Sequence, residues 1–324
     1  MTVNVPLMPQ TQTLRHQDSL LIRRGDHTTQ LTNRRLADYL QSLVAESAAG
    51  HLTLPTDEQE ESLTNFLDFL ERAGLTTQED IDTVSSAARS LWALDPEASD
   101  LHELQERLRA TRVAIVADSP LSQVLRTSLD ETQVPVSIDH ELSAVEEIFE
   151  DPAALPVVIG DHLRDRRLIR ANDAAVRTGR RWMPVVESDG VRTLIGPWMV
   201  PSSSACLECV WLRRAANSPD PTLVDQLVEA ESLETSPRRA VPAGHDHVVA
   251  GILSQKIVEL IGLDDRASAA APGRMCVISR GAPGLTVEEQ HVLRVPRCPV
   301  CSPTRGRGNP QVWAHPAAQG GEKG

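Results

Sequence analysis

The chain has 324 residues and a formal net charge of −13 at neutral pH, with 40% hydrophobic and 24% charged residues. This length predicts two domains, and the apolar content is enough for a buried core, which excludes a chain that is disordered throughout. The acidic balance excludes a general affinity for nucleic acids or anionic membranes, because both carry the same sign of charge. Since no apolar run could cross a bilayer and no signal peptide opens the chain, we expect a cytoplasmic protein with no membrane partner.

The first 80 residues predict a winged helix-turn-helix domain. Residues 1–13 show no periodicity, which predicts a loose arm. Two short apolar stretches around a Gly-Asp turn predict a β-hairpin over residues 19–31. Apolar residues at helical spacing then predict a helix from about residue 36 to Gly50, and a second helix whose face carries Leu63, Phe66, Leu67 and Leu70. Residues 81–111 predict a helical connector.

Residues 112–302 predict an α/β domain. Helical patterns separate apolar runs that are typical of buried strands, and a long apolar helix is predicted over residues 248–260. Strands that alternate with helices form a mainly parallel sheet covered on both faces. Residues 303–324 are rich in Gly, Pro and Ala and predict a disordered tail. The strands are expected at 113–117, 134–138, 157–159 and 182–186, with a further pair within 193–200.

Four of the five cysteines form two C-x-x-C pairs, Cys206 with Cys209 and Cys298 with Cys301. In a reducing compartment such pairs indicate metal ligands rather than disulfides. Four thiolates in a tetrahedron hold structural zinc and leave no position for a catalytic water. The pattern therefore predicts structural Zn²⁺ at these four residues. A redox C-x-x-C and unrelated reduced thiols are the alternatives, and Cys276 is expected to be a buried strand residue.

The turn after the first strand of the α/β domain, residues 118–122, contains no glycine. A nucleotide phosphate at this place needs a close backbone approach, which Gly permits and which Pro120 and side-chain carbons obstruct. Asp118 would also repel the phosphate. No phosphate-loop motif of the G-x-x-x-x-G-K-[ST] type occurs elsewhere. We therefore expect no ATP chemistry.

The segments GPWMVPSSSACLECVWLRR (196–214) and VLRVPRCPVC (292–301) resemble the zinc-knuckle region of ThiF-like proteins from azoline-forming peptide maturation. These proteins are related to ubiquitin-activating enzymes and act in making thiazole- and oxazole-containing products, including thiopeptides. The resemblance implies a Rossmann-like, ThiF-type domain with a zinc tetrathiolate knuckle, preceded by a winged-helix precursor-recognition element. Asp161 and Arg166 resemble positions that adenylating relatives keep near the nucleotide, whereas Arg170 stands where those relatives have an asparagine.

This resemblance implies a non-catalytic component of a cyclodehydratase complex. Such a component binds the leader of a ribosomal precursor peptide and presents it to a YcaO cyclodehydratase, which we expect on another chain because 324 residues leave no region of that size. An ATP-dependent adenylating enzyme acting on a peptide C-terminus is one alternative. A zinc-stabilised winged-helix DNA regulator is another, which the acidic residues 57–80 disfavour. Precursor identity and oligomeric state, including a homodimer, stay open.

A winged helix can bind an extended peptide by adding a strand to its sheet edge. The hairpin supplies the predicted edge and the second helix the predicted wall. Residues 15–35 contain five arginines and two aspartates, which predicts a basic patch that binds acidic residues of the leader. The alternative is that these arginines form a solvated face without a binding role. For Phe69 a groove position and a core position stay open. The predicted peptide-binding residues are Leu20, Ile22, Arg23, Arg24, Thr28, Leu31, Phe66 and Phe69.

Overall fold

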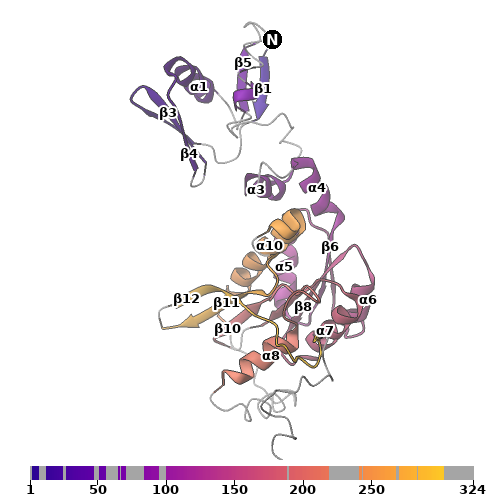
Figure 1. Ribbon diagram of the computed structural model, residues 1–324. Helices are drawn as coiled ribbons and strands as arrows, with labels where there is room; N and C mark the ends of the chain where they lie inside the picture. The colour runs from indigo at the N-terminus through magenta and orange to yellow at the C-terminus, as the bar shows by residue number, and fades with distance from the viewer. Residues whose placement is uncertain are drawn as a thin grey trace, which may run out of the picture. The chain divides into compact units, whose positions relative to one another are not determined.

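The computed structural model divides the chain into two compact units, residues 1–108 and 109–324 (Figure 1). The predicted winged helix and most of its connector lie in the first unit, and the predicted α/β domain lies in the second. None of the helices in the described part has the length and apolar content to cross a membrane. The structure describes residues 2–6, 12–24, 27–46, 51–55, 65, 67–70, 84–94, 100–187, 190–218, 241–242, 244–267, 270–282 and 284–302.

The first unit contains a three-stranded antiparallel sheet in the order β2-β3-β4. The predicted hairpin is confirmed, since β3 (Ser19–Arg24) pairs with β4 (His27–Leu31), and β2 (Gln12–His16) pairs with the other edge of β3. The predicted first helix is α1 (Arg34–Glu46), which packs on this sheet. Burial of apolar side chains between them forms a small core of Leu20, Ile22, Leu31, Ala37, Leu40 and Leu70.

The prediction of a loose arm at residues 1–13 is wrong. Strand β1 (Thr2–Pro6) pairs antiparallel with β5 (His51–Pro55), and residues from Gln12 onward belong to β2. A five-residue strand whose partner follows far along the chain has too short a pattern to be recognised from sequence. The sheet and α1 agree with a winged helix-turn-helix, but most of the second predicted helix lies outside the described residues, so that motif stays a prediction.

The connector is helical, as predicted, with α3 (Ser86–Leu94) and α4 (Leu101–Ala110). The Ser85 backbone N–H donates to Gln105 Oε1 at 2.7 Å, in a buried position that joins the start of α3 to α4. The predicted tail, residues 303–324, lies outside the described residues.

The second unit is built on a seven-stranded sheet in the order β12-β11-β10-β9-β8-β6-β7 (Figure 1). Its first four strands along the chain are parallel, as expected for buried apolar strands that alternate with helices. They are β6 (Arg112–Val116), β7 (Val136–Asp139), β8 (Ala154–Gly160) and β9 (Met183–Val186). The remaining three are antiparallel: β10 (Arg192–Ile195), β11 (Arg274–Gly281) and β12 (Gly284–His291).

In the part of this unit that the structure describes, five helices cover the sheet. Helix α5 (Pro120–Asp130) packs against the long apolar helix α10 (His245–Leu263). Helices α6 (Ala144–Glu150), α7 (Arg166–Thr178) and α8 (Leu207–Ala216) form a second group, in which α7 contacts α6, α8 and β8. Gly179, predicted to end its helix, has a positive φ of 72° and caps α7. The predicted α/β architecture is thus confirmed, with an antiparallel extension at one edge.

Candidate functional site

The four cysteines of the two C-x-x-C pairs meet in one cluster. Cys206 Sγ lies 3.8 Å from Cys209 Sγ and 3.5 Å from Cys298 Sγ, and Cys209 Sγ lies 3.5 Å from Cys301 Sγ. All four sulfur atoms lie within 4.8 Å of one another. The fold therefore brings together, as predicted, two pairs whose members are 92 residues apart along the chain.

The cluster has the dimensions of a tetrahedral metal site. A Zn–S bond of about 2.3 Å in a tetrahedron separates the sulfurs by about 3.8 Å, close to the distances found here. Cys206, Cys209 and Cys298 are buried, and Cys301 is half-buried. A hydrogen bond with the Cys206 thiol lowers the pKa of Cys209 to about 4, which favours one thiolate in the cluster at neutral pH. Cys276 is buried in β11, as predicted.

Helix α8 positions the first cysteine pair. Cys206 is the extended residue that precedes the helix, and Cys209 lies in its first turn, so both sulfurs face the same side. The buried amide oxygen of Asn172, on α7, accepts a hydrogen bond of 2.9 Å from the Leu207 backbone N–H. This N–H is one of the donors that a helix start leaves without an intrahelical partner, so Asn172 fixes the start of α8.

Hydrogen bonds from two arginines fix the segment that carries the second pair. Arg294 donates to the carbonyl oxygens of Ser202 at 2.5 Å and Cys301 at 2.8 Å. Arg213, on α8, donates to the carbonyl oxygen of Leu293 at 2.5 Å. The Val295 backbone N–H donates to Cys209 Sγ at 3.3 Å, a contact typical of the surroundings of a metal-bound thiolate.

Arg164 connects the loop after β8 to α8. Its guanidinium donates to both carboxylate oxygens of Glu208, at 2.5 and 3.3 Å, and lies 4.6 Å from the centre of the Trp211 ring. A bidentate ion pair combined with a cation–π contact is a well-defined geometry for arginine. Because Glu208 lies next to Cys209, this interaction joins the loop that carries Asp161 to the cysteine cluster.

The turn after β6 differs from a phosphate-binding turn in both charge and backbone. Helix α5 begins at Pro120, which has no N–H to donate, and Ser122 uses its N–H to bond the Ser119 carbonyl at 3.2 Å. Asp118 lies before this helix start, 3.6 Å from Arg167 on α7. A helix N-terminus favours anions, but here a carboxylate already lies beside it and would repel a phosphate.

Three other positions were compared with adenylating relatives, and they lie in the loop after β8 and at the start of α7: Asp161, Arg166 and Arg170. Asp161 follows β8, and its N–H donates to the carboxylate of Asp165 at 3.1 Å, which in turn caps α7 by accepting from the Arg167 N–H at 2.7 Å. Arg166 is the first residue of α7. Arg170 lies one turn further and forms an ion pair of 3.7 Å with Glu146. Parallel strands β6 and β8 pair directly, so their following loops are neighbours.

The predicted peptide-binding residues have different environments. Leu20, Ile22 and Leu31 are buried in the small core, so their side chains shape the sheet and do not face solvent. Arg23 and Thr28 are exposed. Phe69 is half-buried and packs against the same core, which favours the core alternative. Phe66 and the side chain of Arg24 lie outside the described residues. Since β3 is the central strand, β4 supplies the hairpin's outer edge.

Two positioning residues, Asn172 and Arg164, were not predicted. Asn172 is a buried polar residue on the face of α7 that also carries Leu168, Ala171 and Ala175. A polar residue on the apolar face of a predicted helix is a signal that could have identified it. Arg164 has no comparable signal, because its partners Glu208 and Trp211 lie more than 40 residues along the chain.

No model of a protein family matches the sequence, and no curated protein matches it. Several solved structures, however, are similar to this chain in fold. A heterocyclase in complex with substrate and cofactor is 18% identical with a TM-score of 0.67, over 92% of this chain and 39% of that chain. The heterocyclase TruD is 16% identical with a TM-score of 0.63, over 93% of this chain and 43% of that chain. MccB of E. coli with ATP is 13% identical with a TM-score of 0.60, over 93% of this chain and 100% of that chain.

These similarities establish the fold. The chain shares this fold with heterocyclases and with MccB, which are ThiF-like proteins, as the resemblance inferred from the cysteine segments implies. The chain spans about two fifths of the length of the heterocyclases and the full length of MccB. MccB has been solved with ATP and, separately, with AMPCPP and MccA.

Replacement of Asn172 by Ala is expected to destabilise the second unit by about 1–3 kcal/mol, because the buried N–H of Leu207 loses its acceptor. Chemical denaturation of the full chain measures this change. Asn217→Ala is the matched control, since Asn217 is exposed at the other end of α8. If both variants unfold at the same denaturant concentration as the parent chain, Asn172 does not fix the start of α8.

Proposed function

We propose that this protein binds the leader of a ribosomal precursor peptide and presents it to a YcaO cyclodehydratase that forms thiazolines or oxazolines. In this proposal it is a scaffold with structural zinc and without nucleotide chemistry of its own. The observation that carries the proposal is the turn after β6, where Asp118 and Pro120 occupy the place at which a phosphate would need glycine and free N–H groups. The charge and backbone of this turn support the part of the proposal that assigns no nucleotide chemistry to this chain.

The similar structures support the peptide part of the proposal. One is a heterocyclase in complex with substrate and cofactor, and another is MccB with MccA. The matched region amounts to 39% of that heterocyclase, so more than half of that chain has no counterpart here. In our proposal the cyclisation chemistry belongs to a YcaO partner on another chain.

The metal part of the proposal is one structural Zn²⁺ held by Cys206, Cys209, Cys298 and Cys301. The thiolate donor set and the sulfur spacings support zinc, and four protein ligands leave no coordination position for substrate. When bound, the ion would neutralise the buried thiolates and cross-link the start of α8 to the segment after β12. Its role would be to hold these two segments together.

Cys298→Ser is expected to abolish stoichiometric zinc and to lower the melting temperature, because metal binding at such sites is coupled to folding. Elemental analysis of protein purified without chelator measures the zinc, and thermal unfolding measures the stability. Cys276→Ser is the matched control, since Cys276 is a buried cysteine in β11 and should leave the zinc content unchanged. Parent protein that contains no zinc would contradict the proposed metal site.

The leader part of the proposal concerns the outer edge of β4. Along this strand Thr28 and Gln30 are exposed, and Arg23, opposite Thr28 on β3, is exposed as well. An extended leader could add a strand here, with main-chain hydrogen bonds supplying affinity. Because the Arg23 side chain is exposed beside this edge, we propose it as a residue that attracts acidic leader side chains.

Arg23→Glu is expected to weaken leader binding roughly 3- to 10-fold and to reduce its dependence on salt, because it reverses an exposed charge near the proposed edge. Fluorescence anisotropy of a labelled leader with the full chain, repeated at several salt concentrations, measures both effects. Arg126→Glu on α5 is the control with the same charge change. Equal affinities and salt dependences for the two variants would mean that the leader binds elsewhere.

A second candidate function is ATP-dependent adenylation of a peptide C-terminus. The similarity to MccB with ATP, over all of that chain, favours it. Asp161, in the loop after β8, is the acidic residue that would then lie near the nucleotide. We place this candidate second because Asp118 brings a negative charge to this turn and Pro120 has no N–H to donate to a phosphate.

A further inference from the structure

Residues 164–181, which include α7, are basic in a strongly acidic protein. They contain seven arginines and two aspartates, whereas the whole chain has a net charge of −13. Five of these arginines contact other parts of the second unit and therefore have structural roles: Arg164, Arg167, Arg170, Arg180 and Arg181. Among the described residues, Arg166 and Arg177 have no hydrogen-bond or ion-pair partner, and both are exposed.

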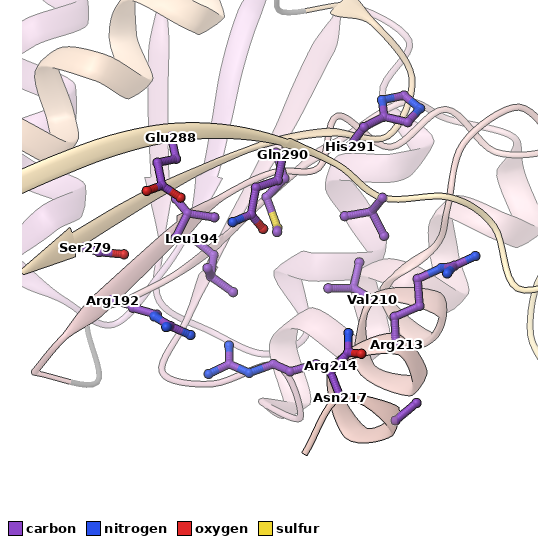
Figure 2. A pocket seen from close by; sticks show the side chains of 14 residues that line it. Arg192, Leu194, Val210, Arg213, Arg214, Asn217, Ser279, Glu288, Gln290 and His291 are labelled. Atoms are coloured by element: carbon purple, nitrogen blue, oxygen red, sulfur yellow. The ribbon is translucent and has the colours of Figure 1, made fainter. Parts of the chain in front are cut away.

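A cavity of about 600 Å³ beside α8 also contains arginines, but these have partners within the chain (Figure 2). Residues of α8 and of strands β10, β11 and β12 line this cavity. Arg213 donates to the carbonyl oxygens at 293 and 294, and Arg192 and Arg214 have partners as well. These three arginines are therefore engaged, whereas Arg166 and Arg177 on α7 are available to another molecule.

The exposed side of α7 has a regular pattern. Arg166 and Arg177 are eleven residues apart, which is about three helical turns, so they lie on one side of the helix and roughly 16 Å apart. Asp173 is exposed between them. Beside this row, Ile169 and Val176 are each 36% exposed and lie seven residues apart. The buried side of the helix carries Leu168, Ala171, Asn172, Ala174 and Ala175.

The stability of α7 accounts for only one of the two exposed arginines. A helix C-terminus favours a cation, and Arg177 lies in the last turn. Arg166 is the first residue of α7, where the helix dipole disfavours a positive charge. In the scaffold function that we propose, no nucleotide phosphate pairs with Arg166. An anionic partner from outside the chain would account for its position.

The spacing of the exposed apolar residues favours a helix as the partner. Helices that pack along one another have apolar residues that recur every seven positions, and charged residues beside this seam determine which partner is chosen. Ile169 and Val176 have this spacing, and Arg166 and Arg177 lie beside them. Two aliphatic residues bury little apolar area, so charge pairing has to supply the selectivity.

We propose that the exposed side of α7 is the docking surface for the cyclodehydratase partner, which presents a helix with acidic and aliphatic residues. Two carboxylates of that helix, about three turns apart, pair with Arg166 and Arg177, because arginine binds carboxylates through paired N–H donors. Aliphatic side chains of the same helix pack on Ile169 and Val176. This inference rests on the proposed function, since it requires a cyclodehydratase on another chain.

The test measures the affinity of the full chain for the purified YcaO cyclodehydratase at several salt concentrations. Combining Arg166→Glu with Arg177→Glu is expected to weaken binding at least about 10-fold and to reduce its salt dependence, because two attractive contacts become repulsive. Arg109→Glu with Arg126→Glu is the matched control, since both residues are exposed and the net charge changes equally. Ile169→Ala with Val176→Ala is expected to weaken binding about 3- to 10-fold at unchanged salt dependence, because these contacts are apolar.

The outcomes separate this inference from the function on which it rests. If the parent chain does not bind the cyclodehydratase, both the proposed function and the docking surface are contradicted. Equal binding by the Arg166 and Arg177 variant and by its control contradicts the docking surface alone. Unchanged affinity after the loss of Ile169 and Val176 excludes a packed helix, and displacement by an equimolar oligonucleotide assigns this face to nucleic acid. The circular dichroism spectrum is the folding control, and Arg166→Gln with Arg177→Gln replaces the charge-reversed pair if that pair does not fold.

Discussion

The meeting of four sulfur atoms from two distant segments is the constraint on which the second unit depends. Cys206 and Cys209 begin α8, whereas Cys298 and Cys301 follow β12, so the cluster closes a loop that contains α10, β11 and β12. Closing a long loop costs conformational entropy, and a metal bound by all four thiolates would offset that cost. The same closure is accompanied by the bonds from Arg213 on α8 to the carbonyl oxygens at 293 and 294, in the segment after β12.

The loops at the carboxyl ends of the parallel strands are held by side-chain contacts of their own. Arg164 joins the loop after β8 to α8 through Glu208 and Trp211. Arg167, on α7, forms an ion pair with Asp118 in the turn after β6. In a doubly wound sheet these loops are the usual place for a nucleotide. Here they are cross-linked by ion pairs with a carboxylate at the helix start. These ion pairs join the loops to α7 and α8, which agrees with the scaffold function that we propose.

Sequence reasoning succeeded where one physical signal was dominant. Buried parallel strands are continuous apolar runs, so β6 to β9 were recognisable, and the spacing of the cysteines indicated one cluster. It failed for β1 and β5, whose pairing is non-local, and it did not anticipate β12, which is exposed along its whole length. Leu20, Ile22 and Leu31 were expected to contact a peptide, but an apolar residue in a short strand is more strongly favoured in the core.

The choice between a scaffold and an adenylating enzyme depends on whether the turn at Asp118 excludes a bound triphosphate. ATP–pyrophosphate exchange, measured with the full chain and its precursor peptide, tests this most directly. We expect no exchange above the level without protein, because a carboxylate and a proline stand where phosphate contacts are needed. Peptide-dependent exchange that disappears on Asp161→Ala would contradict the scaffold function and would establish the protein as an adenylating enzyme.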